Sequence, residues 1–184
     1  YSTPRMAAGL MNFPKITLCM KSTAVPAPNS PTNRKVAKST KRRIGIPLIA
    51  DIHFDYRLAL ESLKSGADGL RLNPGNISDP EQIAKVVKAA KEREVPIRIG
   101  VNAGSLPKSS SKKTSVTVRM VEAALNEVRL LESLNFDLIK VSIKAFDVPT
   151  TVEAYEAIAK KIPYPLHLGI TEAGLPWAGS IRSA

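Results

Sequence analysis

The stretch IPLIAD (residues 46–51) is a short apolar run that ends in a carboxylate. Four later stretches repeat this pattern of an apolar run with polar residues at its end: DGLRLN (68–73), PIRIGVN (96–102), DLIKVSI (137–143) and PLHLGIT (165–171). Short apolar runs bounded by polar and turn-forming residues are typical of buried strands. The sequence therefore predicts five strands.

Amphipathic stretches separate these runs and predict helices over residues 56–66, 79–94, 116–134 and 148–162. Asp79 before Pro80 is a good helix N-cap, and Gly66 stands where a C-cap favours positive φ. Strands that alternate with helices indicate βαβ units and a parallel sheet. The sheet is either open and doubly wound or part of a (βα)₈ barrel. No G-x-G-x-x-G motif follows the first run, which counts against a dinucleotide-binding fold.

The polar ends of the predicted strands favour the barrel, because the carboxyl ends of barrel strands form the functional face. We predict an α/β fold with a partial TIM (βα)₈ barrel of about five βα units. The candidate site residues at these strand ends are Asp51, His53, Arg71, Asn73, Arg98, Asn102, Lys144 and Glu172.

Cations outnumber carboxylates at this predicted face, where Arg71, Arg98, Lys140 and Lys144 follow one another along the chain. Guanidinium groups bind phosphate bidentately and ammonium groups bind it as point charges. A phosphate or diphosphate is therefore the ligand that this set of side chains suits. Glu172 in such surroundings would be ionised and able to act as an acid, a base or a hydrogen-bond partner.

Structural alternatives stay open for several of these residues. Arg71 and Arg98 could instead pair with Asp51 or Asp68 inside the barrel. The two histidines, His53 and His167, could be hydrogen-bonded core residues rather than catalysts. In a strand with a period of two, Lys140, Ser142 and Lys144 share one face, so one of the lysines could be structural.

The net charge of +11 on 184 residues belongs mainly to the N-terminal part, because every Asp and Glu lies at or after Asp51. Residues 1–43, called the basic leader here, are rich in Pro, Ser and Thr and show no sustained period, which predicts disorder. A solvated tail, a transit peptide or a nucleic-acid-binding arm would each fit this composition. Residues 44–184 form the predicted barrel domain.

Composition also excludes some classes of protein. No apolar run approaches the roughly 18 residues that a membrane-spanning helix needs. The only cysteine is Cys19, so this chain alone cannot form a disulfide or a metal site built from several thiolates.

The motifs at the strand ends resemble those of a known enzyme family. The stretches that carry the resemblance are IPLIADIHFDYRLAL (46–60), LRLNPGNI (70–77), PIRIGVNAGSL (96–106), LNFDLIKVSIKAFDV (134–148) and YPLHLGITEAG (164–174). Together they are similar to successive motifs of 4-hydroxy-3-methylbut-2-enyl diphosphate synthase, an enzyme of non-mevalonate isoprenoid biosynthesis. The resemblance covers about residues 42–184.

The resemblance implies a TIM barrel that binds 2-C-methyl-D-erythritol 2,4-cyclodiphosphate and opens its ring reductively with loss of water. It implies electrons from ferredoxin or flavodoxin through a 4Fe-4S cluster, a homodimer, and a location in the bacterial cytoplasm or the plastid. By the same resemblance the diphosphate is held by Arg71, Asn73, Arg98, Asn102 and Lys144. Glu172 would assist proton transfer, and Asp51 and His53 would line the same mouth.

Two departures from the family shape the expectation for this chain. The family's cluster cysteines lie in a C-terminal domain that the sequence does not include, so no metal ligand is expected here and the chain alone is expected to be inactive. The basic leader does not resemble the family's opening strands. The rival hypotheses are another phosphate-binding barrel enzyme and a non-catalytic half-barrel module whose leader binds nucleic acid.

Overall fold

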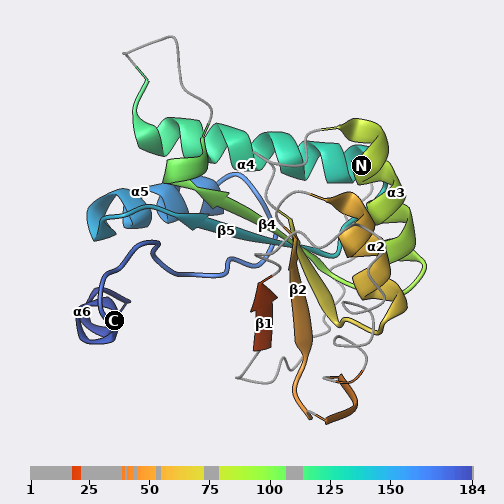
Figure 1. Ribbon diagram of the computed structural model, residues 1–184. Helices are drawn as coiled ribbons and strands as arrows, with labels where there is room; N and C mark the ends of the chain where they lie inside the picture. Colours follow the sequence, from red (N-terminus) through yellow and green to blue (C-terminus); the bar gives the residue numbers. More distant parts are fainter. Residues whose placement is uncertain are drawn as a thin grey trace.

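The computed structural model describes residues 18–21, 39, 41–43, 45–52, 55–72, 79–106 and 114–183. Within these ranges the chain forms one parallel sheet (Figure 1). Its five strands are β1 (Leu18–Lys21), β2 (Leu48–Ile52), β3 (Gly69–Leu72), β4 (Ile97–Asn102) and β5 (Ile139–Lys144). Two candidate site residues, His53 and Asn73, and most of the basic leader lie outside the described residues.

The predicted helices are present, each slightly shorter, and helical residues are added at 39 and 41–43 and at the C-terminal end. The longer helices are α2 (Tyr56–Lys64), α3 (Pro80–Lys91), α4 (Val116–Ser133), α5 (Val148–Ala159) and α6 (Pro176–Ser183), with a 3₁₀ turn, η1 (Ala103–Ser105), after β4. The predicted N-cap is confirmed, because the side chain of Asp79 accepts a hydrogen bond from the backbone N–H of Glu81 at 2.9 Å. Gly66 has a φ of 89°, as its predicted place after α2 requires.

The strand order in the sheet is β1-β2-β3-β4-β5, the same as the order along the chain. A doubly wound sheet reverses its strand order partway, whereas successive crossovers in one direction place all the helices on one side. Figure 1 shows α2, α3, α4 and α5 following one another around the outside of the curved sheet. This arrangement excludes the doubly wound alternative and confirms the partial (βα)₈ barrel.

The two faces of the sheet differ in chemistry because side chains alternate along each strand. In β4 the buried residues Ile97, Ile99 and Val101 belong to the hydrophobic core with residues of α3 and α4. Arg98 and Asn102 lie on the opposite face of the same strand. The outer face therefore holds the core, and the inner face holds the polar residues.

The strand β1 corrects the expectation that the whole basic leader lacks regular structure. Leu18–Lys21 pairs in parallel with β2, with Leu18 opposite Leu48 and Lys21 opposite Asp51. A strand of four residues is too short to show a clear period of two, so the sequence pattern does not indicate it. Where the barrel domain begins stays a prediction.

The predicted strand over residues 165–171 is wrong, although the segment does lie beside β5. It makes one isolated parallel bridge, Val141 with Leu166. The backbone N–H of Val141 donates to Pro165 O at 3.0 Å, and that of His167 donates to Val141 O at 2.8 Å. The ladder stops there, and Leu168 is 70% exposed.

Two hydroxyl groups from α5 explain why this ladder stops. The next backbone donors are Ile143 in β5 and Ala145 just after it, which donate to Tyr155 Oη at 3.2 Å and to Thr151 Oγ1 at 3.3 Å. Tyr155 Oη in turn donates to the carbonyl oxygen of His167 at 2.6 Å. The hydroxyl of Tyr155 therefore stands between two backbone groups that a continuous parallel ladder would join directly.

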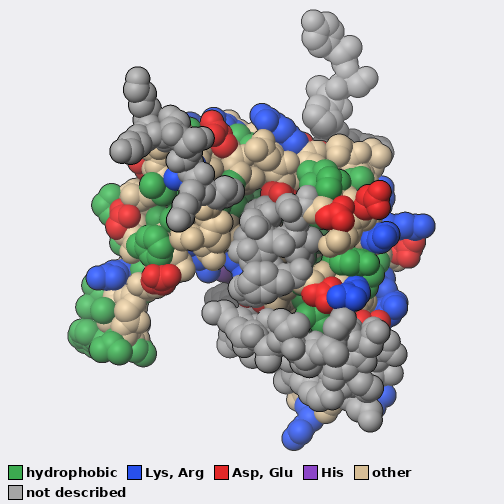
Figure 2. Space-filling view, turned by 45° about the horizontal axis from the view of Figure 1, so that its top comes forward, with side chains coloured by type: hydrophobic (Ala, Val, Ile, Leu, Met, Phe, Trp, Pro, Cys, Tyr) green, Lys and Arg blue, Asp and Glu red, His purple; other side chains and the backbone are tan. Residues whose placement is uncertain are grey.

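The C-terminal segment carries an exposed apolar surface. Leu175, Trp177 and Ile181, in and just before α6, are 79%, 80% and 65% exposed. Figure 2 shows apolar side chains gathered at this corner of the molecule. In the part of the chain that the structure describes, none of the helices has both the length and the apolar character that crossing a bilayer requires.

One carboxylate on α4 gives a pH-dependent prediction for the stability of the fold. Burial raises the pKa of Glu127 from 4.5 to about 7. The folded state therefore binds more protons than the unfolded state between these values, so stability falls as pH rises through that window and is level above it. We expect Glu127→Gln to raise the free energy of unfolding at pH 8 by about 1 kcal/mol, a value reduced for partial solvent screening.

Urea unfolding of the wild type and of Glu127→Gln, at pH 5 and at pH 8, measures this effect. Glu122→Gln is the matched control, because Glu122 is an exposed carboxylate on the same helix. A stabilisation by Glu127→Gln that is equal at the two pH values would contradict the prediction.

Candidate functional site

Across β2 to β5, four charged residues lie in one row. Strand register makes Asp51 the partner of Arg71, Arg71 the partner of Arg98, and Arg98 the partner of Lys140. Partners in parallel strands point to the same face, so all four side chains lie on the inner side of the partial barrel. The row holds three cations and one anion, as the sequence predicts for this face.

The first two residues of the row form a buried ion pair. Arg71 Nη1 donates to Asp51 Oδ1 at 2.7 Å, and their side chains are 9% and 5% exposed. The guanidinium lies against Gly100, where an added Cβ would come within 2.9 Å of Arg71 Nη2 and 3.0 Å of Cζ. The structural alternative for Arg71 is therefore confirmed, and its role in binding a ligand stays a prediction.

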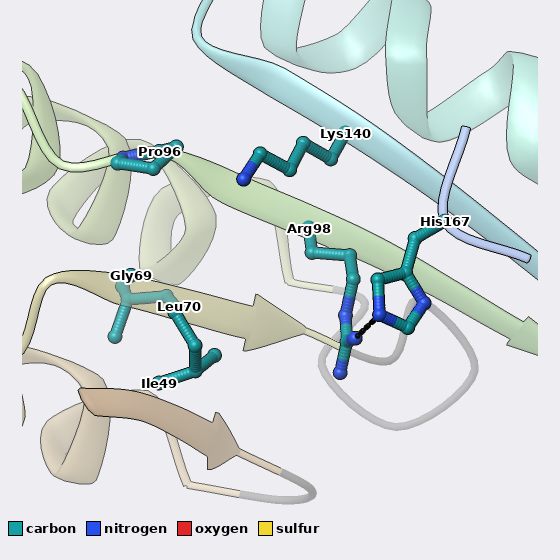
Figure 3. A pocket seen from close by; sticks show the side chains of 7 residues that line it. All are labelled: Ile49, Gly69, Leu70, Pro96, Arg98, Lys140 and His167. Atoms are coloured by element: carbon teal, nitrogen blue, oxygen red, sulfur yellow. Dashed lines mark hydrogen bonds between the residues drawn. The ribbon is translucent and has the colours of Figure 1, made fainter. Parts of the chain in front are cut away.

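Arg98 has a different partner. Its Nη1 lies 3.1 Å from His167 Nε2, and its Nε is buried without a hydrogen-bond partner among the described residues. Figure 3 shows the imidazole and the guanidinium turned toward each other, with the side chain of Lys140 nearby. Most of the donors of Arg98 are thus not used by the described residues, unlike those of a structural arginine.

These side chains border a small pocket on the inner face of the sheet. Its volume is about 70 Å³, and Figure 3 shows its lining, Ile49, Gly69, Leu70, Pro96, Arg98, Lys140 and His167. The lining combines Ile49, Gly69, Leu70 and Pro96, at or near the amino ends of β2, β3 and β4, with the nitrogen-bearing side chains of Arg98, Lys140 and His167. Such a lining suits a small anion or an anionic group better than a cation.

Burial and, to a smaller extent, the neighbouring positive charges lower the pKa values of two side chains in this pocket. Burial lowers the pKa of Lys140, and the charge of Arg98 lowers it further. Partial burial, followed by the charges of Arg98 and Lys144, lowers the pKa of His167, and Lys140 adds to this. Crowded cations that depress one another's pKa values are stabilised by a bound anion.

Two candidate residues lie four positions further along β4 and β5, toward the carboxyl ends of the strands. Asn102, the last residue of β4, is the register partner of Lys144, the last residue of β5. The side chain of Lys144 passes close to Gly169, where an added Cβ would lie 3.2 Å from its Cε. Because residues two and four apart along a strand share a face, these two residues extend the polar surface of Arg98 and Lys140 toward the mouth.

Glu172 stands at the same edge of the sheet but apart from the row. The backbone N–H of its neighbour Thr171 donates to Ala145 O at 3.0 Å, which places Glu172 just beyond the carboxyl end of β5. Glu172 is exposed, and its φ of 51° is unusual for a residue with a side chain. Strained backbone of this kind occurs at functional sites as well as in turns, and the role of Glu172 as the proton-transfer carboxylate stays a prediction.

Besides the predicted ligand-binding residues, the structure brings two more residues, His167 and Tyr155, into the surroundings of the site. His167 was expected to be a hydrogen-bonded residue, and it contacts Arg98. Tyr155 was missed because it lies in the buried stripe of α5, where it reads as one more apolar residue. The signal that could have found it is its hydroxyl, because a buried tyrosine needs a hydrogen-bond partner.

The described residues do not fit the iron-sulfur cluster that the resemblance implies. Such clusters are held by several cysteine thiolates, and the sequence contains one cysteine. Within the described ranges, no three or more His, Cys, Asp or Glu residues come together in a way that could hold a metal ion. No step of the chemistry is therefore assigned to a metal held by this part of the chain.

Comparisons with known proteins agree with this picture. One curated relative, from Dehalococcoides mccartyi, is 64% identical over 147 residues, which cover 80% of this chain and 42% of the relative. A second, from Geobacter sulfurreducens, is 59% identical over 146 residues, which cover 78% of this chain and 41% of the relative. Both are named 4-hydroxy-3-methylbut-2-en-1-yl diphosphate synthase (flavodoxin). The chain thus spans about two fifths of the length of these relatives.

A solved structure and a family match complete the comparison. A dihydropteroate synthetase structure is similar over 84% of this chain and 59% of its own, with a TM-score of 0.55 and 12% identity, which supports the fold alone. The family described as "GcpE TIM-barrel domain" matches residues 11–184, nearly the whole sequence. The match therefore includes β1, the strand in the basic leader. The chain belongs to the GcpE TIM-barrel domain family.

Proposed function

We propose that this chain supplies the diphosphate-binding barrel of a 4-hydroxy-3-methylbut-2-enyl diphosphate synthase. That enzyme opens the ring of 2-C-methyl-D-erythritol 2,4-cyclodiphosphate reductively and removes water. The observation that carries the proposal is the row of Arg71, Arg98 and Lys140 on the inner face, continued toward the mouth by Asn102 and Lys144. The names of the two relatives support it independently.

The proposed roles follow from what each side chain can do. Arg98 has N–H groups left for phosphate oxygens, and Lys144 and Asn102 lie on the same face nearer the mouth. Arg71 lies beside Arg98 in the row, where its ion pair with Asp51 fixes its position. Glu172 at the rim would move a proton to the departing hydroxyl.

Further parts of the proposal rest on residues or partners that lie outside the described structure. His53 and Asn73 would complete the mouth, as the resemblance implies. Electrons would come from a 4Fe-4S cluster whose ligands lie outside this chain, and the printed names of the relatives favour flavodoxin over ferredoxin as the donor. The complete enzyme would be a homodimer of the bacterial cytoplasm or the plastid.

Calorimetric titration with the cyclodiphosphate tests the anion site. We expect Arg98→Ala to weaken binding at least about tenfold, because it removes charge-assisted hydrogen bonds to the diphosphate. Arg129→Ala is the matched control, because Arg129 is an exposed arginine on α4, outside the inner face. Equal affinities of the wild type and Arg98→Ala would remove Arg98 from the proposed site.

A further inference from the structure

The contact between His167 and Arg98 constrains the state of the imidazole. A guanidinium has only hydrogen-bond donors, so in the 3.1 Å contact His167 Nε2 must accept and Arg98 Nη1 must donate. An imidazole that accepts at Nε2 is neutral and carries its proton on Nδ1. The partial burial and the neighbouring cations that lower the pKa of His167 favour this neutral form.

The main chain of His167 is held from two sides. Its N–H donates to Val141 O in β5 at 2.8 Å, and its carbonyl accepts from Tyr155 Oη at 2.6 Å. Tyr155 is 8% exposed and also accepts from the N–H of Ile143, which ties the hydroxyl to β5. The imidazole is therefore attached to a fixed point of the sheet, although the segment that carries it is not a strand.

Because the backbone of His167 is fixed, its imidazole can hold the side chain of Arg98 in one orientation. A long side chain loses rotamer entropy when a ligand holds it in one geometry, and this loss weakens binding. The loss on binding is smaller if the side chain is already ordered in the free protein. The contact with His167 uses one N–H of Arg98 and leaves other donors of the guanidinium for a ligand. His167 Nε2 has no proton to donate to that ligand, so the role argued for this nitrogen acts through Arg98.

We propose that His167 is a positioning residue, whose imidazole accepts a hydrogen bond from Arg98 and holds the guanidinium ready for a phosphate group. Tyr155 fixes the backbone of His167 and so sets where the guanidinium is held. This role rests on the proposed diphosphate site, which it deepens by naming how one of its cations is oriented.

Titration of inorganic pyrophosphate into the full 184-residue chain at pH 7.5 tests the role of His167. We expect His167→Phe to weaken binding about fivefold to tenfold, the effect of losing one hydrogen bond to a charged group. His167→Gln retains an acceptor and should bind within about twofold of the wild type. The double variant Arg98→Ala/His167→Phe should bind no more weakly than Arg98→Ala, because His167 acts through Arg98.

The outcomes separate the two proposals. If Arg98→Ala weakens binding and His167→Phe does not, the anion site stands and the positioning role is overturned. If His167→Gln is as weak as His167→Phe, His167 has only a packing role and the proposal is again overturned. If neither Arg98→Ala nor His167→Phe changes affinity, the proposed site itself falls.

A measurement on the wild type does not depend on whether the variants fold. Long-range ¹⁵N–¹H correlation spectra distinguish the two neutral tautomers of histidine from imidazolium, and the chain has only two histidines to assign. We expect His167 to be the Nδ1–H tautomer at pH 7.5. An Nε2–H tautomer or an imidazolium would overturn the hydrogen bond from Arg98 and the proposal with it.

Discussion

Asp51→Asn lowers the free energy of unfolding by about 3 kcal/mol, because it removes the charge that compensates a buried guanidinium. The side chains of Asp51 and Arg71 are 5% and 9% exposed, so water cannot replace the lost interaction. Urea unfolding followed by far-ultraviolet circular dichroism measures the change. This is the largest effect that we expect from a single substitution near the site.

Asp55→Asn is the matched control for Asp51→Asn. Asp55 pairs with Arg57 at the surface and caps α2, and Asn caps a helix about as well as Asp. The control should therefore cost less than about 1 kcal/mol. The double variant Asp51→Leu/Arg71→Met should recover much of the lost stability, because apolar groups can replace a buried ion pair. Equal losses for Asp51→Asn and Asp55→Asn would contradict this account.

Gly100→Ala lowers the free energy of unfolding by about 2 kcal/mol through overpacking. Its new methyl group would meet the guanidinium of Arg71, which cannot easily move because Asp51 holds it at 2.7 Å. The same clash displaces Arg71, so pyrophosphate binding should weaken together with stability. Urea unfolding and calorimetry on the same preparation measure both effects.

Gly45→Ala is the control for Gly100→Ala, because an added Cβ at Gly45 has no atom within 4 Å. It should change neither quantity measurably. A Gly100→Ala variant that is as stable as Gly45→Ala would show that Arg71 has more room than the geometry indicates.

Much of the fold could be predicted from local patterns. The runs that became β2 to β5 and the helices between them have clear periods, caps and turn residues, as Asp79 and Gly66 illustrate. The strand β1 is too short to show such a pattern, and its pairing with β2 reveals it. The segment 165–171 has the pattern but not the ladder, because hydroxyl groups of α5 take the hydrogen bonds of β5.

The candidate site was predicted only in part, because the sequence indicates which residue types lie at the strand ends but not how their side chains pair. Residue types at strand ends indicate a cationic inner face, and the register places Arg71, Arg98 and Lys140 in one row. Composition cannot decide which cation is paired internally, since Arg71 and Arg98 occupy equivalent positions in their strands. Only the three-dimensional contacts distinguish Arg71, which pairs with Asp51, from Arg98, which contacts His167.

The agreement between strand order and chain order also bears on how the protein is synthesised. Each strand pairs with the strand made just before it, so a growing chain never has to wait for a distant partner. Closing a loop of this size costs little more as the loop lengthens, and domains fold progressively from the N-terminal side during translation. The sheet can therefore grow by one strand and one helix at a time at the ribosome, with the newest strand always at its open edge.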